Sequence, residues 1–515
     1  MQPTQQYLRK NVWEIGGDWA EPILWYARGV AVMKARALAE PTSWRFYGAI
    51  HGIDQQLWRQ LGYLNQSDPM PSNALRQAFW NQCQHGSWYF LPWHRGYLLA
   101  FEANIREVVT NLGGPADWAL PYWNYFKPNQ SSLPPAFASP DWPDGQGNNP
   151  LFVPQRYGPA DDGNVYVPVD QVNLNAMNDP DFTGSASGGS PGFGGVDTGF
   201  EHAGQVHGGI ETQPHDWVHG LVGGSDPQNP RLPGLMSDPD TAGLDPIFWL
   251  HHANIDRLWQ VWLQNPPTHV DPADLNWIQG PSSIGERNFS IPMPGDNTWN
   301  YTPGDMSDVE KLGYTYDDLS PAVAAPEPAQ RLLRLGASAA VVNMVQGAVV
   351  PSGNNVELVG ANREPLRITG SEARTSIQLD SGMRRKVSAS LARAAAEGAA
   401  PDRVFLNLEN VRGLVDSTAF RVYIDLPEGA NPADHSERRA GSVALFGVRK
   451  ASLPQGEHAG QGLTFVLDIT DIVDALHLNN ALDVETLGVR IVPVKPVHEN
   501  AQVSIGRVSV FRQGR

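Results

Sequence analysis

The sequence has a single cysteine, Cys83, among 515 residues. An intrachain disulfide is therefore impossible, and a zinc or iron–sulfur site built from several thiolates is excluded. Basic residues are also scarce, because 37 Lys and Arg stand against 54 Asp and Glu and give a formal net charge of −17. A chain this acidic repels phosphate backbones and anionic lipid, so we expect no nucleic-acid partner.

Long apolar stretches are missing as well. No run of about 18 apolar residues occurs, so no transmembrane helix and no membrane contact are expected. The N-terminal sequence MQPTQQYLRKNVWEIGGDW has no apolar core after its basic residues, unlike a secretory signal. We therefore expect a cytoplasmic protein, while secretion stays open in case a signal was removed. Association of copies into a homo-oligomer also stays open.

The length of the chain indicates two domains, with three as the alternative, because 515 residues exceed one ordinary core. Residues 1–317 are rich in Trp, His, Pro and Gly, and they predict a mainly α domain with a helix-bundle core and long loops. The expected helices cover residues 20–38, 43–62, 72–86, 94–113, 214–222 and 247–264.

The second half of the chain has a different pattern. Residues 318–349 are predicted to be a linker, since LSPAVAAPEPAQ is rich in Pro and Ala. From residue 350 onward, short runs such as RVFLNLENV, AFRVYIDL, SVALFGV and LTFVLDIT predict strands. ITDIVDALHL predicts a helix among them. Residues 350–515 are therefore expected to form an all-β sandwich domain.

Histidines suited to metal binding gather in the first domain. His85 and His94 lie in CQHGSWYFLPWHRGYLLAFE, where Pro92 predicts a helix end, a turn and a new helix near His94. WRFYGAIHGI supplies His51 from a separate helix as a third ligand. Three imidazoles suit copper, zinc or iron.

A second cluster is PHDWVHGLVGG, in which His215 and His219 are spaced i and i+4 and share one helical face. With Asp216 in the place of a base, this segment is close to the HExxH zinc pattern and would predict a hydrolase with one metal. That interpretation leaves the first cluster unexplained. Two sets of three histidines fit a pair of copper ions better.

The third cluster is LDPIFWLHHANIDRLW, where an Asp-Pro pair predicts the start of a helix that carries His251 and His252. Asp256 follows His252 by one helical turn. Its carboxylate is expected beside the imidazole or beside an arginine such as Arg95, and such contacts orient metal ligands.

These segments resemble the copper-binding segments of tyrosinases, catechol oxidases and hemocyanins. The stretch from His85 to Glu102 has the copper A pattern, and DPIFWLHHANID has the copper B pattern. In the copper B pattern the second of two adjacent histidines is the ligand, which implies His252, while His251 contacts or packs beside it. The resemblance implies six ligands: His51, His85, His94, His215, His219 and His252.

The resemblance also implies a chemistry. A pair of copper ions would use dioxygen to hydroxylate monophenols at the ortho position and to oxidise o-diphenols to o-quinones. Two metals suit dioxygen because its reduction to peroxide takes up two electrons, one from each Cu(I). The imidazoles must be deprotonated to ligate, so copper affinity should fall in acid. A catechol oxidase that acts only on diphenols, a hemocyanin-like oxygen carrier and a zinc hydrolase stay as alternatives.

Three further residues carry expectations from the family. Glu211, four before His215, matches a Glu that is thought to hold a water near copper in plant polyphenol oxidases. Asp216 stands where many tyrosinases have Asn, and it would deprotonate the phenol or orient that water, with a mere surface charge as the alternative. Cys83 precedes His85 in a Cys-x-His pattern that forms a thioether in fungal tyrosinases, with a free buried thiol as the alternative.

Other features are less specific. His202 and His207, in GFEHAGQVHGG, are alternative copper B ligands, but their spacing and flanking Gly favour a surface or the rim of the site. LGYTYDDL resembles the tyrosine motif that closes the catalytic core. The later strands resemble the C-terminal domain of plant polyphenol oxidases, which can cover the copper site and keep the enzyme latent. Phe446 is a candidate blocking residue, although SVALFGV also suits a core strand.

Overall fold

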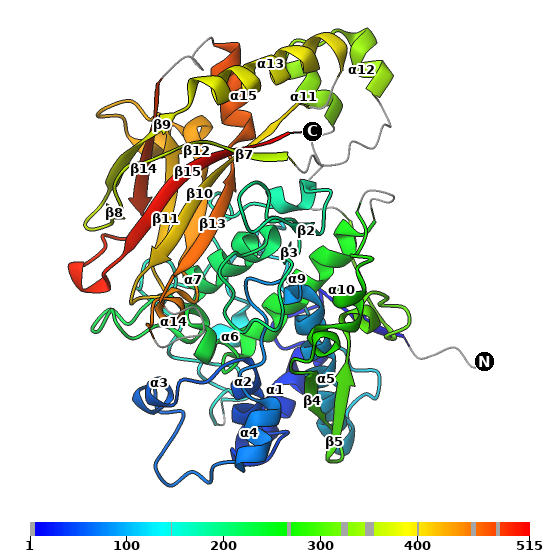
Figure 1. Ribbon diagram of the computed structural model, residues 1–515. Coiled ribbons are helices and arrows are strands. Elements are labelled where there is room, and N and C mark those ends of the chain that lie inside the picture. The colour runs from blue at the N-terminus through cyan, green and yellow to red at the C-terminus, as the bar shows by residue number, and fades with distance from the viewer. Residues whose placement is uncertain are drawn as a thin grey trace.

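The computed structural model describes residues 6–145, 147–264, 269–320, 328–345, 355–398, 401–454, 460–479 and 485–514. A helical part formed by the earlier residues lies against a β-rich part formed by the later ones (Figure 1). Among the described residues, no helix has both the length and the apolar character needed to cross a bilayer.

Five helices make the core of the helical part. They are α1 (Glu21–Ala35), α2 (Trp44–His51), α5 (Phe90–Asn111), α7 (Trp217–Gly223) and α9 (Pro246–Trp262). Helix α5 packs between α1 and α9, and its buried side includes Trp93 and Phe101. The Asp-Pro start predicted for α9 is confirmed, because the Asp245 side chain accepts a hydrogen bond from the Ile247 N–H and Pro246 occupies the first turn.

The predicted helix over residues 43–62 is two helices, and the break lies directly after His51. Gly52 is extended, and the Asp54 side chain then caps a new helix, α3 (Gln55–Gln60), by accepting from two backbone N–H groups. A side chain that caps a new start competes with continuation of the old helix. His51 therefore stands at a helix end.

The prediction around Pro92 is wrong. Helix α4 (Asn73–Phe79) ends early, residues 80–89 form no regular element, and α5 begins at Phe90. Pro92 lies in the first turn of α5, where its missing N–H removes no helical hydrogen bond. His94 is thus on α5, whereas His85 is on the irregular segment before it.

Short elements fill the loops between these helices. The helical turns are α6 (Pro135–Ala138), η1 (Asn175–Asn178), η2 (Glu211–Asp216), η3 (Leu235–Ser237), α8 (Pro239–Ala242), α10 (Leu275–Gln279), η4 (Pro281–Ile284) and η5 (Pro303–Met306). The strands are β1 (Tyr7–Arg9), β2 (Thr183–Gly184), β3 (Gly195–Val196), β4 (Phe289–Met293), β5 (Asn297–Tyr301) and β6 (Tyr314–Tyr316).

The all-β prediction for the later part is confirmed. Among the described residues, nine strands form one antiparallel sheet in the order β12-β11-β14-β9-β7-β15-β10-β13, with β8 paired to β15. Its two ends approach each other where Gly441 faces Leu467, so the sheet is nearly a closed barrel. The strands are β7 (Asn355–Ala361), β8 (Leu366–Arg367), β9 (Ala373–Leu379), β10 (Arg403–Arg412), β11 (Ala419–Ile424), β12 (Arg439–Ala444), β13 (Leu463–Asp468), β14 (Thr486–Pro493) and β15 (Ser504–Gly514).

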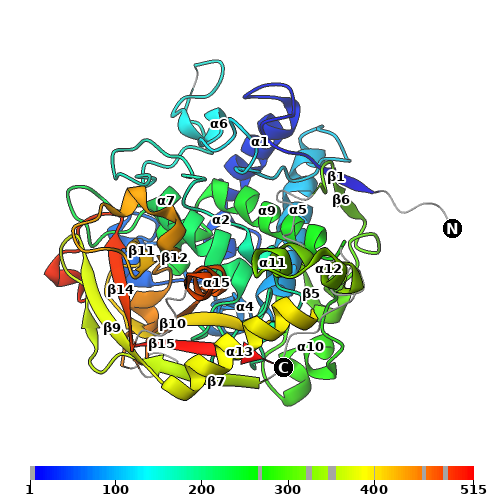
Figure 2. The same ribbon diagram turned by 90° about the horizontal axis from the view of Figure 1, so that it is seen from above.

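Helices cover the end of the barrel that faces away from the helical part (Figures 1 and 2). They are α11 (Pro328–Arg334), α12 (Ala339–Val345), α13 (Ser381–Glu397) and α15 (Thr470–Leu478). Helix α15 was predicted, whereas β9 and α13 were not. The predicted linker 318–349 includes residues 321–327 and 346–349, which lie outside the described residues, and the predicted domain boundaries stay a prediction.

The two parts share a hydrophobic core around Phe446. Phe446, Ala444 and Ala419 come from the β-rich part but pack in the hydrophobic cluster of the helical part. SVALFGV is therefore a strand only as far as Ala444. After it the chain turns, with Gly447 at a φ of 84°, and enters helix α14 (Val448–Ala451).

Candidate metal centre

The first histidine triad gathers side chains from three different segments. His51 comes from the end of α2, His94 from α5 and His85 from the irregular segment before α5. One nitrogen from each ring lies within 4.8 Å of the others, and all three side chains are buried. The structure thus brings together the residues predicted for copper A.

The second triad lies directly beside the first. His215 and His219 come from the η2–α7 turn, and His252 comes from α9, again with one nitrogen each within 4.8 Å. The Nε2 atoms of His219 and His252 are 3.2 Å apart. The rings of His94 and His252 stack with centroids 4.4 Å apart, so the two triads share one space.

The other ring nitrogens of these histidines face the protein. Three Nδ1 atoms lie within hydrogen-bond distance of backbone carbonyls, and an N–H there leaves the Nε2 lone pair turned to the shared space. These contacts are His51 to Pro239 at 2.8 Å, His94 to Phe90 at 2.8 Å and His219 to Met236 at 2.7 Å.

The triads fit a pair of metal ions. Within the described residues, the buried Nε2 atoms of His51, His94 and His215 have no hydrogen-bond partner, and the same holds for His85. Burial lowers the pKa of His51 to about 4, and it lowers the pKa of the other five rings well below the ordinary value. Neutral imidazoles with free lone pairs suit copper.

A third buried cluster adjoins the second triad and contains both predicted catalytic residues. The Asp216 carboxylate accepts hydrogen bonds from Nδ1 of His215 at 2.9 Å and from Nδ1 of His207 at 2.7 Å. Both Glu211 oxygens accept from the N–H of Gly86 at 3.0 Å. Asp216 is therefore no surface charge, since it is fully buried.

The imidazolium of His207 offsets part of the negative charge of this cluster. Burial works against its charged form, but the carboxylates of Glu211 and Asp216 outweigh that effect and raise the pKa of His207 to about 9. Burial also raises the pKa of Glu211, although the neighbouring imidazolium opposes the shift. His202 and His207 were predicted at the surface or at the rim of the site, and the surface alternative is wrong because they are only 3 % and 2 % exposed. Flanking glycines signalled a loop, and a loop can still be covered by another domain.

Cys83 lies against two imidazoles. Its Sγ is 3.2 Å from Nδ1 of His85 and 3.5 Å from Nδ1 of His202. The predicted pairing of Cys83 with His85 is thus close in space, and the thioether itself stays a prediction.

Asp256 does not reach an imidazole but forms a buried ion-pair network behind the site. Its carboxylate accepts from Arg95 at 2.5 Å, from Arg9 at 3.1 Å and from the hydroxyls of Tyr314 and Tyr316. Burial disfavours its charge, yet the two guanidinium groups lower the pKa of Asp256. The network joins α9, α5 and the tyrosine motif on β6, and so fixes the helices that carry His94 and His252.

His251 packs against the second triad without being part of it. Neither of its ring nitrogens has a hydrogen-bond partner among the described residues, and its ring stacks at 5.6 Å on that of His215. It packs against a predicted ligand, as the sequence interpretation expected.

Phe446 closes the space beside the triads. Its ring stacks on that of His219 at a centroid distance of 4.4 Å, and it lies 5.5 Å from His85 and 5.6 Å from His215. The side chain is 1 % exposed. A side chain of the β-rich part therefore lies directly against histidines of both triads.

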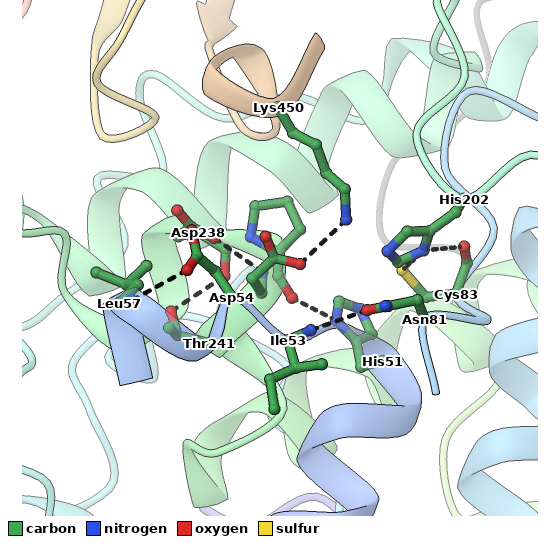
Figure 3. A network of polar contacts seen from close by, with 12 residues as sticks. His51, Ile53, Asp54, Leu57, Asn81, Cys83, His202, Asp238, Thr241 and Lys450 are labelled. Atoms are coloured by element: carbon green, nitrogen blue, oxygen red, sulfur yellow. Dashed lines mark hydrogen bonds and ion pairs between the residues drawn. The ribbon is translucent and has the colours of Figure 1, made fainter. Parts of the chain in front are cut away.

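Ion pairs fix the segment that carries Phe446. Arg449 donates to Asp238 at 2.9 Å and to Asp54 at 3.1 Å, and Lys450 pairs with Asp240 at 3.1 Å. Figure 3 shows Lys450 reaching down from α14 toward the turn that carries Asp238, beside His51. These pairs join the β-rich part to the helical part.

Comparisons with known proteins agree with this geometry. Residues 41–265 match the family model of the common central domain of tyrosinase, and residues 355–513 match a domain of unknown function (DUF7868). The chain is 33% identical to tyrosinase HcTyr1 of Hahella sp. (strain CCB-MM4) over 98% of this chain and 99% of that protein. It is 26% identical to a chloroplastic polyphenol oxidase of Malus domestica over 68% of this chain and 56% of that protein.

A solved structure supports the same fold. Latent apple tyrosinase aligns with a TM-score of 0.60 over 99% of this chain and 98% of that chain, at 22% sequence identity. The helical part and the β-rich part are thus both shared with that structure.

Proposed function

This chain belongs to the tyrosinase family of copper-dependent phenol oxidases, and we propose that it both hydroxylates monophenols at the ortho position and oxidises o-diphenols to o-quinones. Its cofactor is a pair of copper ions. When bound, the pair supplies the two electrons that dioxygen takes up. The single observation that carries the proposal is two adjoining triads of buried, neutral imidazoles.

We assign the ligands from that geometry. His51, His85 and His94 would hold one copper, and His215, His219 and His252 would hold the other. The chain's own carboxylates would manage the proton of the phenol. Asp216 and Glu211 are buried beside the second triad, from where they would take up the hydroxyl proton of an incoming phenol through a water.

Purified, copper-loaded protein tests the proposal when it is mixed with tyrosine or with catechol. Quinone absorbance from both substrates is the expected result, measured before and after removal of the covering side chain. Quinone from catechol alone would favour a diphenol oxidase. No quinone from either substrate would favour an oxygen carrier, and one zinc per chain would favour a hydrolase.

The first prediction concerns Asp216. An Asp216→Asn variant is expected to lower the ratio of tyrosine to catechol turnover by about tenfold or more, because general-base catalysis contributes at least that much. The amide also offers one acceptor where two imidazole N–H groups now donate. Asp226→Asn, on the loop after the same helix, is the control. An unchanged ratio would remove Asp216 from the mechanism.

We also propose that the chain is latent. Phe446 stacks on His219, and a phenol would need that same space to approach the triads. The ion pairs of Arg449 and Lys450 keep the segment in place, because each unpaired charge would stay partly buried if its partner moved away.

A second prediction follows for these ion pairs. Replacing Arg449 and Lys450 together by Gln is expected to raise catechol oxidation by the intact chain severalfold, because the covering segment opens more often. The control is Arg331→Gln, which breaks an ion pair with Asp474 that lies wholly in the β-rich part. Equal activity of both variants at equal thermal stability would contradict this role.

A further inference from the structure

His207 has no part in the proposed reaction, yet it is buried beside the second triad. Its Nδ1 donates to one Asp216 oxygen at 2.7 Å and lies 3.8 Å from a Glu211 oxygen. The other Asp216 oxygen accepts from Nδ1 of His215 at 2.9 Å. A single carboxylate therefore bridges His207 and the proposed ligand His215.

A third metal ion is the alternative interpretation of such a cluster, because His207, Glu211 and Asp216 place ligand atoms within 4.8 Å of one another. Their hydrogen bonds argue against it. Each Asp216 oxygen already accepts from an imidazole, and both Glu211 oxygens accept from the N–H of Gly86. An ion would have to break these contacts in a fully buried place.

The position of His207 depends on the β-rich part. Thr464 of β13 donates its backbone N–H to the carbonyl of Gln205 at 2.7 Å, and Val206 pairs with Thr464 as an isolated bridge. The ring of Phe465 packs on the ring of His207 at 5.7 Å. Docking of β13 thus holds the imidazole between the two carboxylates.

We infer that His207 is a positioning residue that holds the Asp216 carboxylate against Nδ1 of His215, and thereby fixes the ring whose Nε2 faces the metal. The inference rests on the proposed function, since it takes His215 as a copper ligand. A carboxylate bonded through only one oxygen can rotate, whereas a second donor fixes its plane. Groups that orient a metal-binding imidazole commonly change metal affinity by about 10–100-fold when they are removed.

Two variants of the full chain separate this role from simple packing. The side-chain nitrogen of His207→Asn takes the place of Nδ1 and keeps the donor, whereas that of His207→Gln takes the place of Nε2 and loses it. Each protein is loaded with Cu(II), and the dissociation constants are measured by competition with a chelator. The visible absorption of the copper-loaded protein is recorded in parallel.

The expected result is a loss of affinity of about 10–100-fold in His207→Gln at one of the two copper sites, with altered absorption. His207→Asn should stay within about threefold of the wild type on the same argument. Equal affinity of all three proteins would overturn the inference, and so would equal weakening of both variants. If His207→Gln does not fold, His207→Leu takes its place in the comparison. A wild type that binds no copper would overturn the proposed function and this inference with it.

Discussion

Replacing Phe446 by alanine is expected to raise quinone formation by the intact chain on the order of tenfold to a hundredfold. The ring packs beside His219, His85 and His215, so we expect a phenol to bind only in the fraction of molecules in which the segment is open. The apparent affinity for the phenol equals the intrinsic affinity multiplied by that open fraction. A segment that is open about 1% of the time therefore weakens binding about a hundredfold. Removing the ring makes the space permanently available.

Leu445→Ala is the matched control for this experiment. Leu445 precedes Phe446 but packs in the core of the β-rich part, whereas Phe446 packs in the core of the helical part. Both substitutions remove a buried apolar side chain, and each costs about 2–5 kcal/mol of stability. Activation by Phe446→Ala alone, with both melting temperatures recorded, identifies the blocking side chain. Equal activation of the two would mean that loosening of the whole domain, and not the ring, opens the site.

The sequence predicted which histidines come together because most of them lie in short patterned segments. The i, i+4 spacing of His215 and His219 and the Asp-Pro start before His252 depend on local backbone geometry, which neighbouring residues determine. The mainly α and all-β parts were predicted for the same reason. Periodicity reports which face of an element is buried, and that holds over most of its length.

The features that the sequence did not predict depend mostly on contacts between segments that are distant in the chain. His207 stands among glycines, so local sequence indicated an exposed loop, but β13 covers it. Phe446 follows an apolar run, and no local pattern shows that the strand ends at Ala444 and sends the next side chains to another core. Pro92 is compatible with a helix end and equally with the first turn of a helix, so local sequence does not decide between them.

His252→Ala is expected to lower the copper content from about two ions per chain to about one and to abolish quinone formation, whereas His251→Ala keeps both. The adjacent positions differ in geometry and not in residue type, which makes them a matched pair. His252 places Nε2 3.2 Å from that of His219, inside the second triad. The ring of His251 instead packs against the ring of His215, and burial lowers the pKa of His251 to about 3.

The large effect expected for His252→Ala follows from the number of side chains that bind each copper ion. With His252 gone, the second copper would keep only His215 and His219, and a site for copper or zinc normally uses three or four protein ligands. The remaining ion cannot supply both electrons, so loss of one copper removes the whole reaction and not half of it. Copper is counted by elemental analysis. Quinone formation is measured in the Phe446→Ala background, so that blocked entry of the substrate does not hide activity. Copper loss in His251→Ala with retention in His252→Ala would reverse the assignment of these two histidines.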